Sequence, residues 1–168
     1  MSAVLVEAGP DKGAVWHFGE PVKEQRALEA GTAWADLSHH NIIAVSGADR
    51  LKWLHDLTTQ FVSDLQPGVW MPNMILDAKG HIEFQFNLVD DGTTTFLVLD
   101  PGYSELLIEY LTKMKFMLRV EVRDATSEYA VLRAPGAPTA IGGPFALVPR
   151  SEVEEMKKTF GGVATQVG

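Results

Sequence analysis

The sequence predicts an α+β domain with an antiparallel sheet and helices packed on one of its faces. Three consecutive segments between residues 69 and 100 have the alternation or β-branched content of strands. The turns between them, at 77–80 and 90–92, are so short that only antiparallel strands can be joined by them. Amphipathic helical segments precede and follow these strands, so the helices have a sheet to cover.

The elements before the three strands are a buried strand and a helix. Residues 42–45 are continuously apolar, as in a buried strand. In residues 48–60 apolar side chains recur at helical spacing, and residues 46–49 resemble a capping box at the start of that helix.

The second helix begins with Asp100 and Pro101, which suit the N-cap and the first helical position, and it ends before Phe116. Two further strands are expected at 118–122 and 129–132.

A Gly- and Pro-rich segment, residues 134–144, marks a loop or a boundary between structural units. We therefore expect an α+β unit over residues 1–133. Residues 134–168 then form a connection and the start of an incomplete second unit, with a short helix after a capping box at 151–154.

The composition is that of a globular protein, with 46% apolar and 21% charged residues in a chain of 168. The formal net charge of -8 argues against binding to nucleic-acid phosphates. There is no cysteine, which excludes disulfides and thiolate ligands within this chain. No secretory signal or membrane span is visible, so a cytoplasmic location is expected, with neither nucleic acid nor membrane as a partner.

The five histidines do not indicate a metal site. They lack the spacing of known zinc motifs, and no cysteine accompanies them. His39 and His40 would point to opposite sides of an extended chain, so at most one of them could face a given site. No nucleophile-elbow, P-loop or dinucleotide motif occurs either.

The most informative segment is the first strand of the hairpin between residues 77 and 100. Its apolar residues alternate with Glu83, Gln85 and Asn87, which places the polar side chains on the opposite face of the strand. Together with Asp100, at the end of the next strand, they form a set of donors and acceptors that suits an uncharged heterocycle with amide-like edges. The alternative is that this polar face simply meets water.

Three segments carry a family resemblance: WADLSHHNIIAVSGADRLKWLHDLTTQ (34–60), LDAKGHIEFQFNLV (76–89) and FLVLDPGYSELLIEYLTKMKF (96–116). In order and spacing they resemble the aminomethyltransferase superfamily, which includes the glycine-cleavage T-protein and the YgfZ proteins. The resemblance covers about residues 33–131. It implies a tetrahydrofolate-binding α+β scaffold, which in the family has three domains around a central folate pocket.

The resemblance also implies site residues. Aligned on Gly80, Gln85 takes the place of a T-protein aspartate that orients the folate amine, and since glutamine cannot ionise, no catalytic residue is expected there. Asp100 corresponds to a folate-contacting asparagine, with helix capping as the alternative role. Asn73 and Met74 fall in the stretch that lines the folate ring, with strand packing as the alternative.

The glutamine favours a YgfZ-like protein, a type implicated in the maturation or repair of iron–sulfur enzymes. YgfZ proteins continue with a K-G-C-x-x-G-Q-E segment and a β-barrel, which are absent here, so we expect this chain to be part of a longer protein. Two alternatives stay open. One is a folate-dependent one-carbon transferase or demethylase with Glu83 as its carboxylate, and the other is an interaction scaffold that binds no folate.

Overall fold

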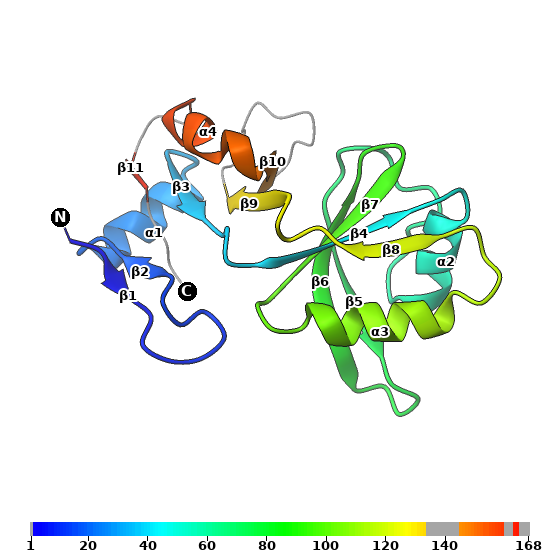
Figure 1. Ribbon diagram of the computed structural model, residues 1–168. Coiled ribbons are helices and arrows are strands. Elements are labelled where there is room, and N and C mark those ends of the chain that lie inside the picture. Colours follow the sequence, from blue (N-terminus) through cyan, green and yellow to red (C-terminus); the bar gives the residue numbers. More distant parts are fainter. Residues whose placement is uncertain (1, 134–144, 160–162, 165–168) are drawn as a thin grey trace. The chain divides into compact units, whose positions relative to one another are not determined.

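The computed structural model describes residues 2–133, 145–159 and 163–164. Contacts divide the chain into one unit made of Met1–His40 and Ser127–Gly168 and a second made of Asn41–Thr126 (Figure 1). The expected connection at 134–144 lies outside the described residues, so the predicted boundary after residue 133 stays a prediction.

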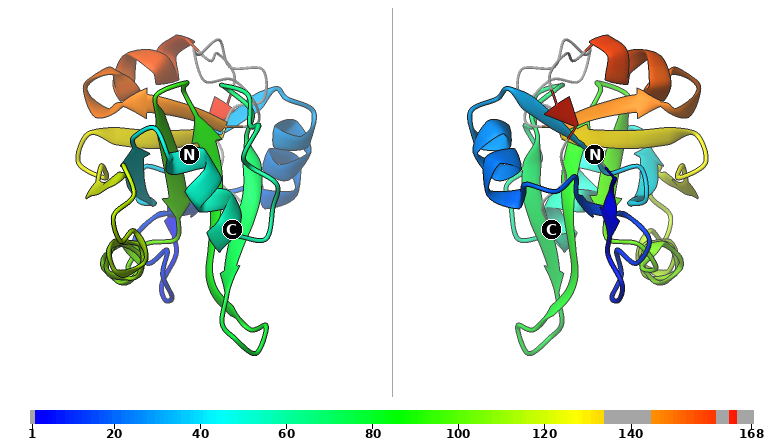
Figure 2. Two further views of the ribbon diagram at one scale, coloured as in Figure 1. Left: turned by 90° about the vertical axis from the view of Figure 1, so that its right-hand side faces the viewer. Right: turned by 90° about the vertical axis from the view of Figure 1, so that its left-hand side faces the viewer.

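The unit Asn41–Thr126 contains an antiparallel sheet with the strand order β5-β6-β7-β4-β8. Its elements, in chain order, are β4 Asn41–Ser46, α2 Arg50–Leu57, β5 Met71–Leu76, β6 Ile82–Asp90, β7 Thr94–Leu99, α3 Ser104–Met114 and β8 Glu121–Asp124. The turn between β5 and β6 extends well past the other strands (Figure 2). The α+β class with antiparallel pairing is confirmed.

Both helices of this unit pack on the same face of the sheet. Trp53 and Leu54 of α2 and Leu107 and Leu111 of α3 belong to one buried apolar cluster. The strands contribute Ile43, Val45, Ile75, Phe86, Leu88, Leu97 and Leu99 to that cluster. Each fully buried leucine stabilises the fold by about 1.5–3 kcal/mol through the area that it removes from water.

The opposite face of the sheet is apolar at its centre. Val89, Phe96 and Val98 are buried there, and Ile42 and Ala44 of β4 are equally buried. On this face the polar side chains of β6, Gln85 and Asn87, lie nearer the β5–β6 turn than the buried Val89 does.

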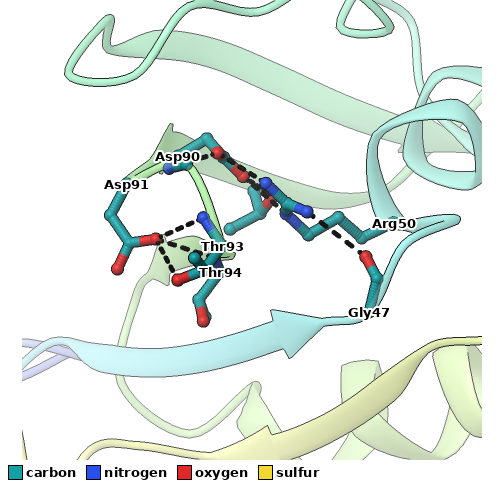
Figure 3. A network of polar contacts seen from close by, with 8 residues as sticks. Gly47, Arg50, Asp90, Asp91, Thr93 and Thr94 are labelled. Atoms are coloured by element: carbon teal, nitrogen blue, oxygen red, sulfur yellow. Dashed lines mark hydrogen bonds and ion pairs between the residues drawn. The ribbon is translucent and has the colours of Figure 1, made fainter.

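A buried ion pair ties α2 to the β6–β7 hairpin (Figure 3). Arg50 donates from Nε and Nη2 to the two carboxylate oxygens of Asp90, at 2.8 Å each, and Asp90 is 1% exposed. The same carboxylate accepts hydrogen bonds from Thr95 Oγ1 at 2.6 Å and from the Gly92 amide at 2.7 Å. Asp90 therefore fixes both the hairpin turn and the start of α2.

The first helix is shorter than the predicted span of 48–60. Asp49 stands at the N-cap of α2, but its side chain forms no cap. Its carboxylate instead accepts hydrogen bonds from the Arg119 amide at 2.9 Å and from Arg119 Nη2 at 2.8 Å. At the other end Thr58 is extended, which ends the helix at Leu57. The predicted capping box is therefore wrong, because a distant arginine takes its carboxylate.

The second helix begins later than predicted. The chain turns at Gly102, whose φ is 91°, and α3 starts at Ser104 with Tyr103 at the N-cap. The Gly102 amide donates to Asn41 Oδ1 at 2.8 Å, which holds this turn against the start of β4. Asp100 is therefore not the helix cap.

The last strand of this unit is also displaced: β8 spans Glu121–Asp124, not residues 118–122.

The unit of Met1–His40 and Ser127–Gly168 has its own sheet, in the order β10-β9-β3-β11, and a small β1-β2 sheet. Its elements are β1 Val4–Leu5, β2 Val15–His17, α1 Pro21–Glu29, β3 Ala33–Asp36, β9 Tyr129–Arg133, β10 Phe145–Pro149, a 3-10 turn Arg150–Glu152, α4 Val153–Thr159 and β11 Val163–Ala164. Its core contains Leu132, Val148 and Val153. The predicted strand at 129–132 and the short helix after residue 151 are confirmed.

Among the described residues, the longest helix has 11 residues, and none is long and apolar enough to cross a bilayer.

Candidate functional site

A cavity of about 190 Å³ opens in the unit Asn41–Thr126, between the first half of β6 and the segment that leads from β7 to α3. It is lined by Ile82, Glu83, Phe84, Gln85, Leu99, Asp100 and Tyr103. Three of the six residues predicted to bind folate, Glu83, Gln85 and Asp100, are thus brought together.

The cavity exists because β7 leaves the sheet before β6 does. The pairing of β6 with β7 runs from Asp90↔Thr95 to Asn87↔Val98, whereas β6 continues to Ile82 with β5 as its paired neighbour. After Leu99 the chain turns away toward α3, so the two strands diverge and leave a hollow. The hydrogen bond from the Gly102 amide to Asn41 Oδ1 fixes the direction of that turn.

A β-bulge adjusts which side chains reach the cavity. Ile75 pairs with Phe84 but Leu76 pairs with Ile82, which leaves Glu83 as the extra residue. Bulges twist a strand locally and redirect its side chains. As a result Ile82, predicted on the packed face, is 57% exposed and lines the cavity beside Glu83 and Gln85.

The polar groups of the cavity are mainly hydrogen-bond acceptors. Glu83 and Asp100 contribute carboxylates, Gln85 an amide and Tyr103 a phenol, and no lining residue is cationic. Within the described part of the chain, the side chains of Glu83 and Gln85 make no hydrogen bond to other residues. The neighbouring Tyr110 does not line the cavity. Its pKa is raised by burial and then by the charge of Glu83, so the Tyr110 phenol keeps its proton near neutral pH. The cavity therefore suits a ligand that presents N–H donors, and it does not suit an anion.

A shallower hollow of about 370 Å³ adjoins the cavity and shares Glu83, Phe84 and Tyr103 with it. It adds Leu106, Tyr110 and, at its edge, Glu109 and Lys113, whose side chains pair at 2.6 Å. The two hollows adjoin through these shared residues, and Lys113, the cation of the second hollow, is paired with Glu109.

Met74 and Asn87 flank the cavity without lining it. Met74 pairs with Gln85 across the β5–β6 ladder, so both side chains lie on one face of the sheet. Asn87 pairs with Pro72 and Val98 on that same face. Their predicted contacts with folate stay predictions.

Asn73 lies on the other face and is 1% exposed. Its Oδ1 accepts a hydrogen bond from the Gln60 amide at 3.2 Å, and its Nδ2 donates to Thr58 Oγ1 at 2.8 Å. The side chain thus holds the loop after α2 against β5. This position agrees with strand packing, the alternative role that the sequence left open for Asn73.

Tyr103 and Tyr110 were not singled out from the sequence. By its spacing in the sequence Tyr110 belongs to an apolar stripe of the second helix, and a helix that starts at Pro101 would place Tyr103 inside its first turn. The glycine after Pro101 is the one signal that could have moved the helix start to Ser104 and exposed Tyr103 to the cavity.

The structure corrects the expectation for His39 and His40. The backbone is not extended there but turns, with the His40 amide donating to Leu37 O at 3.0 Å. The two rings lie edge to face with their centroids 4.7 Å apart. Both imidazoles can therefore face one site.

No family model matches the chain. An aminomethyltransferase of Cupriavidus necator is 25% identical over 137 residues, which are 81% of this chain and 31% of that protein. A putative chloroplastic transferase of Arabidopsis thaliana is 25% identical over 139 residues, 81% of this chain and 32% of that protein. The crystal structure of the glycine cleavage system aminomethyltransferase T from Bartonella henselae aligns with a TM-score of 0.63. That alignment has 19% sequence identity and covers 77% of this chain and 36% of that one.

The fold is aminomethyltransferase-like. The sequence matches support the aminomethyltransferase superfamily for this chain at low identity. The chain spans about a third of the length of the curated relatives that it matches, so the activity of a whole relative does not transfer to it directly.

Proposed function

We propose that this chain binds tetrahydrofolate, as a protein of the YgfZ type, with Glu83, Gln85 and Asp100 contacting the pterin. The observation that carries the proposal is the cavity in which β6 and the β7–α3 segment bring these three side chains together. The aminomethyltransferase-like fold and the match to an aminomethyltransferase support folate as the ligand.

The chemistry of the cavity fits a reduced pterin. The pyrimidine edge of a pterin carries neighbouring N–H donors, which a carboxylate can accept in pairs, and an amide such as that of Gln85 can both donate and accept. The rings of Phe84 and Tyr103 offer flat apolar surface for the bicyclic system.

The size of the cavity also limits which part of tetrahydrofolate it can hold. Its volume of about 190 Å³ is below the roughly 300–1,000 Å³ of sites that hold a whole drug-sized ligand. The pterin head therefore occupies the cavity, and the aminobenzoyl-glutamate part lies along the adjoining hollow toward Lys113.

The residues of this chain bind and orient the folate, which when bound supplies the amine nitrogens that carry one-carbon groups. Gln85 cannot exchange a proton, so the position where the T-protein resemblance places an aspartate provides hydrogen bonds without acid–base chemistry. This is the reason for proposing the YgfZ type, and with it a role in the maturation or repair of iron–sulfur enzymes. We extend the proposal to iron–sulfur proteins as partners and to a cytoplasmic location.

Titration of the full chain with tetrahydrofolate tests binding. Gln85→Leu removes one or two hydrogen bonds, so the Kd is expected to rise about tenfold, equivalent to about 1.4 kcal/mol. Gln66→Leu is the matched control, because Gln66 is exposed, bonds to Asp64 O at 3.1 Å and does not line the cavity. Equal affinity of the two variants would contradict the proposal.

The second candidate is a folate-dependent aminomethyltransferase or demethylase. The observation in its favour is that Glu83 places a carboxylate inside the cavity, where it could act in place of the missing aspartate. Assays of one-carbon transfer from a methylamine donor distinguish the two functions. Turnover that is lost in Glu83→Gln, while folate is still bound, would favour the enzyme.

A further inference from the structure

Three potential metal ligands meet in the unit Met1–His40 and Ser127–Gly168, and none of them lines the cavity proposed to bind folate. Asp11, His39 and His40 each offer one ligand atom, and these atoms all lie within 4.8 Å of one another. His39 Nε2 and Asp11 Oδ1 are 2.9 Å apart. All three residues are half-buried, so the group is neither sealed in the core nor fully hydrated.

Hydrogen bonds hold the turn that carries the histidines in place. The His40 amide donates to Leu37 O at 3.0 Å, and the Ser38 amide donates to Asp36 Oδ1 at 2.8 Å. Arg150 Nη2 donates to Ser38 O at 2.8 Å, which ties the turn to the segment before α4. Two of the three ligands are thus positioned by the fold before any ion binds, which lowers the entropic cost of binding.

Asp11 lies in the loop that joins β1 to β2, and backbone hydrogen bonds close that loop. The Val6 amide donates to Ala14 O and the Gly13 amide donates to Val6 O, each at 2.9 Å. Asp11 also borders an open hollow of about 320 Å³ in this part of the chain. An ion can therefore reach the carboxylate from solvent.

We propose that Asp11, His39 and His40 bind a divalent transition-metal ion, with Zn²⁺ the ion that this donor set favours. Two imidazoles and one carboxylate are ligands that zinc accepts, and three protein ligands leave a coordination position open. Ligand atoms around a tetrahedral zinc ion are about 3.4 Å apart, given bonds of about 2.1 Å. His39 Nε2 and Asp11 Oδ1, 2.9 Å apart, are closer than this, and no two of the ligand atoms are more than 4.8 Å apart. Side-chain rotations are the adjustment that the site would need.

Zn²⁺ and Co²⁺ titrations of the full chain, without a histidine tag, test the proposal. The wild type is expected to bind one ion. Bound Co²⁺ should show the visible absorption of an ion with a low coordination number. His40→Ala and Asp11→Asn are each expected to weaken binding by at least about tenfold. Substitution of a residue that only hydrogen-bonds to a metal ligand can already cause a loss of that size. Thermal unfolding of the metal-free variants establishes that they are folded.

His81→Ala is the matched control. His81 Nδ1 lies 3.0 Å from Asp77 Oδ2, so it is also a histidine–carboxylate pair, but among the described residues no second histidine completes a metal-binding group with it. This variant is expected to bind metal like the wild type. Binding that survives both His40→Ala and Asp11→Asn, or that falls equally in His81→Ala, would overturn the proposal, as would no binding at all.

Discussion

Asp90 shows how much one carboxylate can organise in this fold. It is buried, it pairs with Arg50 through two hydrogen bonds, and it accepts two more bonds from Thr95 and the Gly92 amide. Every acceptor position of the carboxylate is used within the β6–β7 hairpin and the start of α2 (Figure 3). Removal of one partner would leave the other as a buried charge without compensation.

Asp90→Ala is therefore expected to lower the free energy of unfolding by about 3–5 kcal/mol. The double variant Asp90→Leu with Arg50→Met should lose less than Asp90→Ala, because no unpaired charge stays in the core. Urea denaturation of the three proteins measures these differences. A double variant less stable than Asp90→Ala would contradict the account.

The same pair predicts an acid-dependent loss of stability. Burial raises the pKa of Asp90, but the hydrogen bonds from Arg50, Thr95 and Gly92 outweigh it, and the pKa lies below its ordinary value. A carboxyl with a lowered pKa in the folded state stabilises the fold above its unfolded pKa of about 3.9, and this contribution is lost as the pH falls through the folded pKa.

We thus expect Asp90→Asn to be less stable than the wild type above about pH 4, with the difference shrinking as the pH falls further. Unfolding free energies measured from about pH 2 to about pH 7 test this. A difference that is constant over that range would show that the ionised form of Asp90 is not what stabilises the hairpin.

Among the elements, the turn from β4 into α2 depends on a glycine. Gly47 has a φ of 112°, and a Cβ at this position would lie 2.0 Å from Arg119 O. That oxygen belongs to the backbone just before β8, which cannot move without disturbing the sheet.

Gly47→Ala is expected to destabilise the protein by several kcal/mol, from both the positive φ and the clash. Gly80→Ala is the matched control: its φ is 85°, but no atom lies within 4 Å of the added Cβ. The control should cost only the conformational penalty of about 1–2 kcal/mol. Similar melting temperatures for the two variants would contradict this explanation.

The sequence pattern predicts the three consecutive strands β5, β6 and β7 well, and the starts of α2 and α3 poorly. Strands β5, β6 and β7 are defined by local alternation and by turns a few residues long. The start of α2 depends instead on Arg119, 70 residues away from Asp49, and the turn before α3 depends on Asn41, 61 residues away from Gly102. Local pattern carries no information on such partners.

The candidate site follows the same rule. Alternation in β6 and the resemblance to the superfamily identified Glu83, Gln85 and Asp100, which line one cavity. Tyr103 was not singled out, because its place depends on where α3 begins. For Asn73 the sequence leaves both folate contact and strand packing open; the residue is buried on the face opposite Gln85, in a register of β5 that the sequence alone does not define.

For the whole molecule, the formal charge of -8 opposes the binding of an anionic ligand. The glutamyl tail of tetrahydrofolate is anionic, so its affinity should rise as salt is increased from about 0.01 M to about 0.15 M and the repulsion is screened. Tetrahydrobiopterin, which lacks the tail, should show little change. Isothermal titration of both ligands at the two salt concentrations is the measurement, and a falling affinity for tetrahydrofolate would contradict the expectation that the net charge outweighs the attraction of the tail to Lys113.

The central claim is that a reduced pterin binds between β6 and the β7–α3 segment. Amide NMR spectra of the isotope-labelled full chain, recorded during a titration with tetrahydrofolate, test it most directly. The account predicts saturable shifts that are largest at residues 82–85, Asp100, Gly102 and Tyr103. Two results would contradict it. One is the absence of shifts up to about 1 mM ligand, since a Kd of that size corresponds to a binding free energy of only about −4 kcal/mol. The other is shifts confined to residues outside the cavity.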